Sequence, residues 1–313
     1  MRNLLATLLI LTTAILSAAA GDSGSAANPA SPADDISAGN DRLPATRLPQ
    51  PLRHPGTAEK IGYREGDTLV VIPANIRMIP NYCFAGCEGL RRVRFEPGSR
   101  LAQIGDFAFA ECADLIECDL PEGVRRIGDG VFRGCSNLKS ISLPHAIWEI
   151  PREAFAYCRS LESVDFPAGL RFIRPLAFLH CNSLSIDSIP EYVKGIGNNA
   201  FGSCHSLRSM ILPAACDELE SYAFADCTAL ESIILPSKTE MLGELLLSGC
   251  RRLRSITIPA FVPPVMECNS TLFEPDDKDA WRDCKVYVPA GRLEIYRRSP
   301  AWSRFRHIIE QKN

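Results

Sequence analysis

Residues 127–144 read Ile-Gly-Asp-Gly-Val-Phe-Arg-Gly-Cys-Ser-Asn-Leu-Lys-Ser-Ile-Ser-Leu-Pro, and their pattern decides the fold. The spacing Ile-Gly-x-x-x-Phe-x-x-Cys-x-x-Leu-x-x-Ile-x-Leu-Pro recurs along most of the chain. Its cysteines are Cys87, Cys112, Cys135, Cys158, Cys181, Cys204, Cys227 and Cys250, separated by 25 residues once and by 23 residues six times. A period that is kept over this length predicts a solenoid, in which each repeat forms one coil.

Two columns of apolar residues keep step with the cysteines. Three residues before each cysteine stand Phe84, Phe109, Phe132, Phe155, Phe178, Phe201, Phe224 and Leu247. Three residues after each cysteine stand Leu90, Leu115, Leu138, Leu161, Leu184, Leu207, Leu230 and Leu253. One repeat cannot bury these side chains alone, so we expect successive coils to stack and to cover one another.

Within one repeat the apolar spacing changes from two to three. Ile141 and Leu143 alternate with serines, as in a strand with one buried face. Pro144 ends that strand because it cannot donate the next ladder hydrogen bond. Ile147 and Ile150 indicate a second short strand or extended segment. The Phe-x-x-Cys-x-x-Leu segment has apolar residues at spacing three, which predicts a short helical or 3₁₀ turn that faces inward. The expected fold class is an α/β repeat solenoid with a parallel β-sheet.

The 23-residue unit resembles the bacterial BspA-like, or treponemal-type, leucine-rich repeat over roughly residues 68–259. This resemblance implies a right-handed leucine-rich repeat solenoid with a C-terminal cap. Family members are typically secreted or surface proteins of host-associated bacteria, and some are implicated in adhesion to host matrix proteins or to other cells. A shared scaffold does not fix a ligand. The sequence departs from the pattern at Asp187, which takes an apolar strand position, at Leu219-Glu220 and at Leu247.

The N-terminal residues indicate export. Arg2, an apolar run over residues 4–16 and the small residues 18–20 have the pattern of a signal peptide over residues 1–20. No later stretch is long and apolar enough for a membrane-spanning helix, which needs about 20 residues. The first cysteine is Cys83, so the cleavage site has no cysteine to lipidate. We expect an exported protein at the cell surface, in the periplasm or secreted.

Three further segments follow the signal peptide. Residues 21–60 are rich in Ala, Ser, Gly, Asp and Pro, which predicts a flexible linker. Residues 61–259 hold about eight repeats, and residues 260–313 break the period and are expected to form a capping region. Within that region we predict a strand at 285–289, helices over 291–298 and 302–310, and burial of Leu293, Tyr296, Trp302 and Phe305.

Thirteen cysteines in an exported chain raise the question of disulfides or metal ligands. Most of them occupy inward columns of the repeat, where parallel side chains point the same way, so we expect reduced thiols that pack as small hydrophobes. Cys268 and Cys284 lie outside the repeat and are the candidate disulfide. His180-Cys181 and Cys204-His205 lack the short ligand spacings of a structural zinc site, so no metal or other cofactor is expected.

The remaining sequence signals concern function. The net charge is −3 and no long basic run is present, so nothing indicates nucleic acid as a partner. No catalytic motif was found, which favours a non-catalytic binding or adhesion module with a protein or glycan partner, such as a host matrix protein. A structural or assembly component of the cell envelope is the alternative, and an enzyme or enzyme inhibitor with a site hidden by sequence order is the third. The oligomeric state is left open.

A partner that binds the exposed sheet face would contact the residues that alternate with the buried strand positions. These candidates are Arg92, Arg94, Glu117, Asp119, Ser140, Ser142, Ser163, Asp165, Ile186, Ser188, Ser209, Ile211, Ser232, Ile234, Ser255 and Thr257. The first half of this face is charged, and the second half carries small residues and isoleucines.

Overall fold

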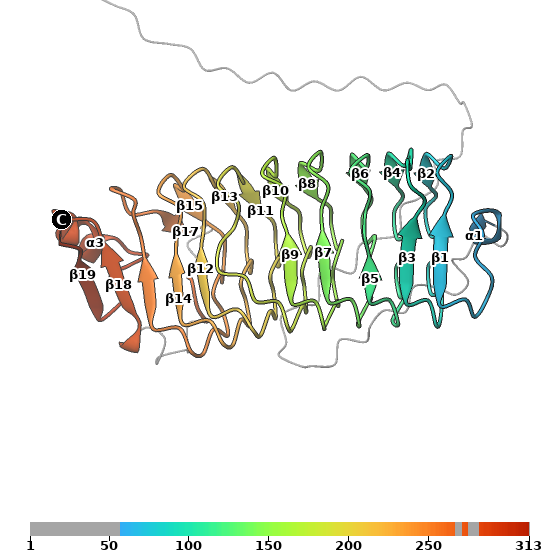
Figure 1. Ribbon diagram of the computed structural model, residues 1–313. Helices are drawn as coiled ribbons and strands as arrows, with labels where there is room; N and C mark the ends of the chain where they lie inside the picture. The colour runs from blue at the N-terminus through green and yellow to red at the C-terminus, as the bar shows by residue number, and fades with distance from the viewer. Residues whose placement is uncertain (1–56, 267–270, 275–281, 313) are drawn as a thin grey trace, which may run out of the picture. The chain divides into compact units, whose positions relative to one another are not determined.

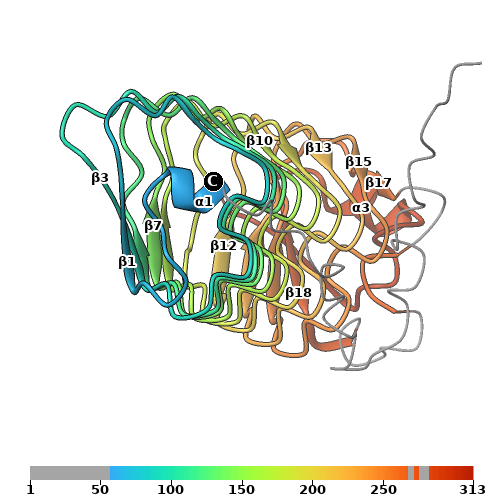
Figure 2. The ribbon, with the colours of Figure 1, turned by 90° about the vertical axis from the view of Figure 1, so that its right-hand side faces the viewer.

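A computed structural model describes residues 57–266, 271–274 and 282–312, and these form one stack of coils (Figure 1). Seen from the end, successive coils nest over one another, and each coil passes through three sides (Figure 2). The helices whose bounds lie within the described ranges are α1 (Thr57–Lys60) and α3 (Leu293–Arg298). Ala58 of α1 is buried, so the folded unit begins slightly before the predicted linker ends.

The first side of the stack is a parallel sheet, as predicted. Its strands are β1 (Leu69–Ile72), β3 (Arg92–Phe95), β5 (Glu117–Cys118), β7 (Ser140–Ser142), β9 (Ser163–Asp165), β12 (Ser209–Ile211), β14 (Ser232–Ile234), β16 (Ser255–Thr257), β18 (Lys285–Val288) and β19 (His307–Glu310). Equivalent residues of neighbouring repeats pair, such as Ile141 with Val164 and Met210 with Ile233. The middle residue of each three-residue strand is buried, which confirms the alternation read from the sequence.

The second side carries a further set of parallel strands. They are β2 (Met78–Ile79), β4 (Gln103–Ile104), β6 (Arg126–Ile127), β8 (Glu149–Ile150), β10 (Phe172–Ile173), β11 (Gly195–Ile196), β13 (Glu218–Leu219), β15 (Met241–Leu242) and β17 (Val265–Met266). In β4, β6 and β11 the last residue is the isoleucine of the repeat's Ile-Gly pair, and the glycine follows it. At Gly128 a Cβ would lie 2.4 Å from the backbone nitrogen of Asp106 in the preceding coil, so only glycine allows the two coils to approach.

The third side corrects one sequence prediction, because the Phe-x-x-Cys-x-x-Leu segment is not helical. Its backbone forms consecutive turns, with residues in the left-handed region four positions apart, such as Glu153 (φ 56°) and Tyr157 (φ 64°). Every second N–H donates to the next coil: Phe155 N donates to Ala177 O at 2.8 Å. A left-handed residue in every turn prevents a continuous right-handed helix, and the inter-coil hydrogen bonds offset its conformational cost.

The core consists of the columns predicted from the repeat. Neighbouring phenylalanine rings from Phe84 to Phe224 stack with centroids 5.0 to 5.7 Å apart. The repeat cysteines are buried, and from Cys112 onward each Sγ–H donates to a phenylalanine carbonyl of the preceding coil at 3.0 to 3.2 Å. The cysteine column therefore combines apolar packing with a satisfied weak donor.

One buried charge interrupts the third side. Arg133 is 5% exposed, and its guanidinium pairs with Glu111 at 3.2 Å and with Glu153 at 3.1 Å. Its Cζ also lies 5.4 Å from the centroid of the Tyr157 ring. Burial raises the pKa of the Glu111 carboxyl, and the Arg133 guanidinium opposes that rise. The arginine thus bridges three consecutive coils through their side chains.

Replacing Arg133 by methionine is expected to lower the free energy of unfolding by about 2 kcal/mol, because two partly buried carboxylates lose their shared cation. Equilibrium urea unfolding at pH 7 measures the change. Arg152→Met is the matched control, since Arg152 also pairs with Glu153, at 3.2 Å, but its side chain is 40% exposed. The control should cost less than about 1 kcal/mol. Equal losses in the two variants would contradict the bridging role of Arg133.

The C-terminal region completes the first sheet. The strand predicted at 285–289 is confirmed as β18, and the helix predicted over 291–298 is confirmed in part as α3. The helix predicted over 302–310 is wrong, because His307–Glu310 form strand β19, which pairs with β18 in parallel. An unpaired β18 would expose its outer row of backbone donors and acceptors, and β19 satisfies that row. Trp302 is buried, and its Nε1–H donates to Pro264 O at 2.8 Å.

Candidate functional site

The first sheet is interrupted at residues 185–188, between β9 and β12. The strands of the preceding and following repeats are regular, but this repeat contributes only a single bridge, between Ser188 and Ile211. Within the described residues the sheet is also discontinuous between β5 and β7. The break at 185–188 differs because a whole strand is lost from its coil.

The cause of the break is Asp187. Its position corresponds to Ile141, Val164 and Met210, which are buried in their repeats. A carboxylate cannot occupy such a position without a buried partner, and Asp187 instead lies exposed. Ile186 moves into partial burial and packs against the core in its place. Ile186, which was predicted on the exposed face, is thus half-buried, as Ile234 is on the same face.

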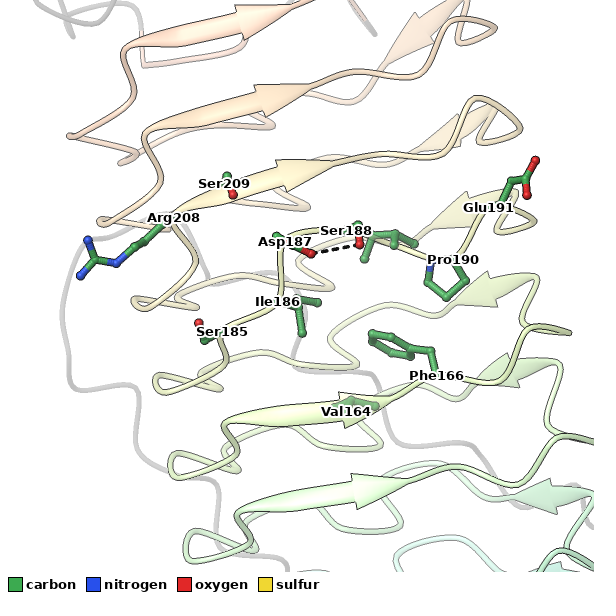
Figure 3. Close-up of a pocket in the computed structure, with 11 residues that line it drawn as sticks. Val164, Phe166, Ser185, Ile186, Asp187, Ser188, Pro190, Glu191, Arg208 and Ser209 are labelled. Carbon is green, nitrogen blue, oxygen red and sulfur yellow. Dashed lines mark hydrogen bonds between the residues drawn. The ribbon is translucent and has the colours of Figure 1, made fainter.

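The lost strand leaves a hollow of about 790 Å³, which we name the Asp187 notch (Figure 3). It is lined by Val164, Phe166, Ser185, Ile186, Asp187, Ser188, Ile189, Pro190, Glu191, Arg208 and Ser209. Phe166 packs edge-on against Phe178 of the stacked column, with ring centroids 6.0 Å apart. The hollow is thus lined from three neighbouring coils, with apolar side chains from the first and polar groups from the next two.

The polar groups of the notch have both signs of charge. Asp187 accepts a hydrogen bond from the Ser188 hydroxyl at 3.1 Å. Glu191 and Arg208 are exposed at opposite sides of the opening (Figure 3). Hydroxyls, carboxylates and one guanidinium around an apolar floor suit recognition of a polar ligand. In the described part of the chain no group of three His, Cys, Asp or Glu side chains is placed to hold a metal ion.

The charged half of the predicted face forms cross-strand pairs. Arg94 pairs with Glu117 at 2.7 Å and with Asp119 at 2.5 Å, which links β3 to the next coil. Ser142 donates to Asp165 at 3.1 Å across β7 and β9. These side chains were predicted to contact a partner, and here they bond to one another.

The other predicted face residues follow the strands without a common cluster. Arg92, Ser140, Ser163, Ser188 and Ile211 are exposed. Ser209, Ser232, Ile234, Ser255 and Thr257 are half-buried. The face is therefore brought together as one surface, with the notch at the coil of Asp187 and a second hollow, of about 430 Å³, beside Arg94 and Asp119.

Sequence reasoning missed part of the notch. Phe166, Glu191 and Arg208 line it but were absent from the candidate face. One signal was available, because Asp187 departs from an otherwise apolar column. The candidate disulfide stays a prediction: Cys268 lies outside the described residues, and Cys284 is buried, which raises the pKa of its thiol to about 12.

Several solved structures are similar to this chain. A leucine-rich cell surface protein from Faecalibacterium prausnitzii A2-165 shares 22% identity, with 79% of each chain covered and a TM-score of 0.37. The leucine-rich repeat protein of T. pallidum shares 25% identity, with 78% of this chain and 89% of that chain covered and a TM-score of 0.40. The pneumococcal vaccine antigen PcpA shares 20% identity, with 79% and 80% covered and a TM-score of 0.36.

No curated protein matches the chain. None of the described helices is long and apolar enough to cross a membrane. The family described as the BspA type leucine-rich repeat region matches with six copies, over residues 67–185 and 148–274. This match covers well over half of the sequence and agrees with the stacked coils, so the chain belongs to the BspA-type leucine-rich repeat family.

Proposed function

We propose that this protein is an exported, non-catalytic binding module that contacts a protein or glycan partner, such as a host matrix protein, through the face of the first sheet. The Asp187 notch is the centre of that contact. The observation that carries this proposal is the loss of a core residue at one position of an otherwise regular column. Positions that break a local folding rule are expected at functional sites.

The notch has a cost in stability. A buried valine or isoleucine at position 187 would contribute about 1.5–3 kcal/mol, and Asp187 forgoes that contribution. Ile186 recovers part of it through its partial burial. What the chain gains is a concave surface with apolar and polar groups, of a size that binding sites commonly have. Because solenoids bind along extended faces, the flanking serines and charges of the sheet would complete the contact.

Export rests on the signal-peptide pattern of residues 1–20, which lie outside the described residues. The linker assigned to residues 21–60 would hold the solenoid away from its point of attachment or leave it free in solution. A binding role also agrees with the absence of a catalytic motif from the sequence.

The test closes the notch by restoring the repeat pattern. The double variant Ile186→Ser/Asp187→Val gives this coil the Ser-Val-Ser pattern of a regular strand. We expect a higher melting temperature and at least a tenfold weaker affinity for the partner, because the hollow fills with a continuous strand. The partner is first found by screening the full chain against arrayed extracellular matrix proteins and glycans, and affinities are then measured by calorimetry.

Ser142→Ala is the control, because it changes the same face two coils away without altering the sheet. Its affinity should stay within about threefold of the original protein. A double variant that is more stable and binds equally well would overturn the assignment of the notch. A screen with no binder, together with tight association of the protein with the cell envelope, would favour the structural alternative.

A further inference from the structure

The second side of the stack presents exposed aromatic rings among cations, in the coils around β8, β10 and β11. We name this group the Trp148 cluster; it consists of Trp148, Arg171, Phe172, Arg174, Tyr192 and Lys194. Trp148 is 49% exposed and Tyr192 is 54% exposed, unlike the buried aromatic column of the core. Large rings in contact with water on neighbouring coils mark an interaction surface.

The rings of the cluster hold a fixed geometry. Trp148 and Phe172 meet edge-on, with centroids 6.2 Å apart and planes at 85°. Arg174 lies over the Phe172 ring, with Cζ 4.5 Å from its centroid, and Arg171 lies over the Tyr192 ring at 5.2 Å. Cation–π contacts of this kind orient both partners. The cluster is therefore organised before any ligand arrives.

The charges of two cations in the cluster, Arg171 and Lys194, are available to a ligand. The Arg171 Nη1 donates to the carbonyls of Gly169 (3.1 Å) and Leu170 (3.2 Å), which fixes the guanidinium without neutralising it. Within the described ranges neither Arg171 nor Lys194 forms an ion pair with a carboxylate, whereas Arg174 pairs with Glu149 at 2.9 Å. Arg171 N donates to Trp148 O, and Lys194 N donates to Arg171 O, so the three residues form a row across adjacent coils.

A buried glycine lets two side chains close over the backbone of this row. Gly195 of β11 pairs with Phe172, and a Cβ there would lie 3.0 Å from both the Phe172 ring and a Glu218 carboxylate oxygen. The row extends over about 10 Å at the usual strand spacing, which is the scale of a short stretch of polymer.

Charge along the second side favours an anion at this end. The earlier coils add the exposed cations Arg77, Arg125 and Arg126. The same coils also carry the acidic residues Glu122, which contacts His145 at 2.6 Å, Asp106, which accepts from the backbone N–H of Asp129 at 3.0 Å, and Asp129 itself. The coils after β11 carry the acidic residues Asp217, Glu218, Glu220, Glu240 and Glu244. An anionic ligand is therefore attracted to one half of the side and repelled by the other.

We propose that the Trp148 cluster binds an acidic polysaccharide. The C–H faces of sugar rings stack on Trp148 and Tyr192, because the electron-rich faces of aromatic rings attract such hydrogens. Carboxylate or sulfate groups of the sugar bind Arg171 and Lys194. A protein partner is less favoured, because the surface is open and offers rings and point charges without a pocket for a side-chain anchor. This site is distinct from the Asp187 notch and does not depend on its function.

Titration calorimetry of the full chain with three probes tests the proposal: a heparin-derived oligosaccharide, an oligogalacturonate and an uncharged amylose fragment. We expect both acidic probes to bind, with affinity that falls as salt rises, and amylose to bind at least tenfold more weakly. Trp148→Ala and the double variant Arg171→Ala/Lys194→Ala should each weaken the acidic probes at least tenfold. Unchanged melting temperatures verify that these variants are folded.

Met241→Ala is the matched control. Met241 is 52% exposed on β15 of the same side, but it lies in the acidic half. Its affinity for the acidic probes should not change. The proposal is overturned if neither acidic probe binds at low salt, or if Trp148→Ala binds both normally. It is also overturned if single-stranded DNA or polyglutamate binds as tightly with the same dependence on Trp148, since the surface would then select charge without the sugar.

Discussion

Raising the pH from 8 to about 10.5 is expected to unfold the solenoid, because the cysteine thiols buried in its core are protonated in the folded state. Burial raises the thiol pKa above its ordinary value of 9.0 for ten cysteines. They are Cys83, Cys112, Cys118, Cys135, Cys158, Cys181, Cys204, Cys216, Cys250 and Cys284. For Cys83 and Cys216, which are less enclosed, the pKa rises to about 12.

The sign follows from proton linkage. Above pH 9 the unfolded chain loses its thiol protons while the folded chain keeps them, so the unfolded state binds fewer protons and is favoured. The stabilisation is complete below pH 9 and is lost as the pH rises toward the folded pKa values. In that window each thiol lowers the free energy of unfolding by about 1.4 kcal/mol per pH unit, so ten thiols lower it by on the order of 10 kcal/mol per pH unit. The free energy of unfolding of a typical domain is only about 5–15 kcal/mol.

The melting temperature, followed by circular dichroism in reductant at intervals between pH 7 and 10.5, measures this effect. We expect little change up to pH 8.5 and a steep fall above pH 9. Cys158→Ala is the control variant. It is less stable throughout because of its cavity, but its loss of unfolding free energy per pH unit should be smaller by about one thiol's share. A melting temperature that stays constant to pH 10.5 would show that the cysteine column does not hold protonated thiols.

The stacked core could be predicted from the sequence because its residues repeat. A cysteine and a leucine at fixed positions in eight repeats, with a phenylalanine in seven of them, define three columns, and stacking buries them together. The helical turn was predicted wrongly from the same residues. Apolar spacing of three suits a helix, but it also suits the turns around Glu153 and Tyr157. The left-handed backbone of these two residues does not change the spacing of the apolar residues, so the sequence pattern cannot distinguish the turns from a helix.

The candidate sites depend on contacts between coils, which apolar spacing does not report. Asp187 was visible as an exception, but the inward movement of Ile186 depends on the space that a missing side chain leaves. The Trp148 cluster joins residues from three repeats, and its two most exposed rings, Trp148 and Tyr192, come from different repeats. The strand at His307–Glu310 was missed for a similar reason, because the open edge of β18 that it pairs with is a property of the stack.

Replacing Phe178 by alanine is expected to lower the free energy of unfolding by about 3–5 kcal/mol, since a fully buried ring leaves a cavity that its neighbours cannot fill. Phe178 stacks on Phe155 and Phe201, with centroids 5.3 and 5.2 Å away. A solenoid gains its stability from contacts between neighbouring coils, so this substitution weakens two interfaces at once. Urea unfolding, followed through the midpoint and the slope, measures the loss.

The control is Phe178→Leu, because Leu247 takes the corresponding position in the last repeat and is fully buried there. Leucine keeps most of the volume, so we expect a loss below about 1.5 kcal/mol. The two variants also test the functional face, since Phe166 at the floor of the Asp187 notch packs edge-on against Phe178. Phe178→Ala should therefore weaken binding at the notch even at temperatures where the protein remains folded, whereas Phe178→Leu should preserve it. Unchanged binding by a folded Phe178→Ala protein would show that the floor of the notch does not depend on the stacked column.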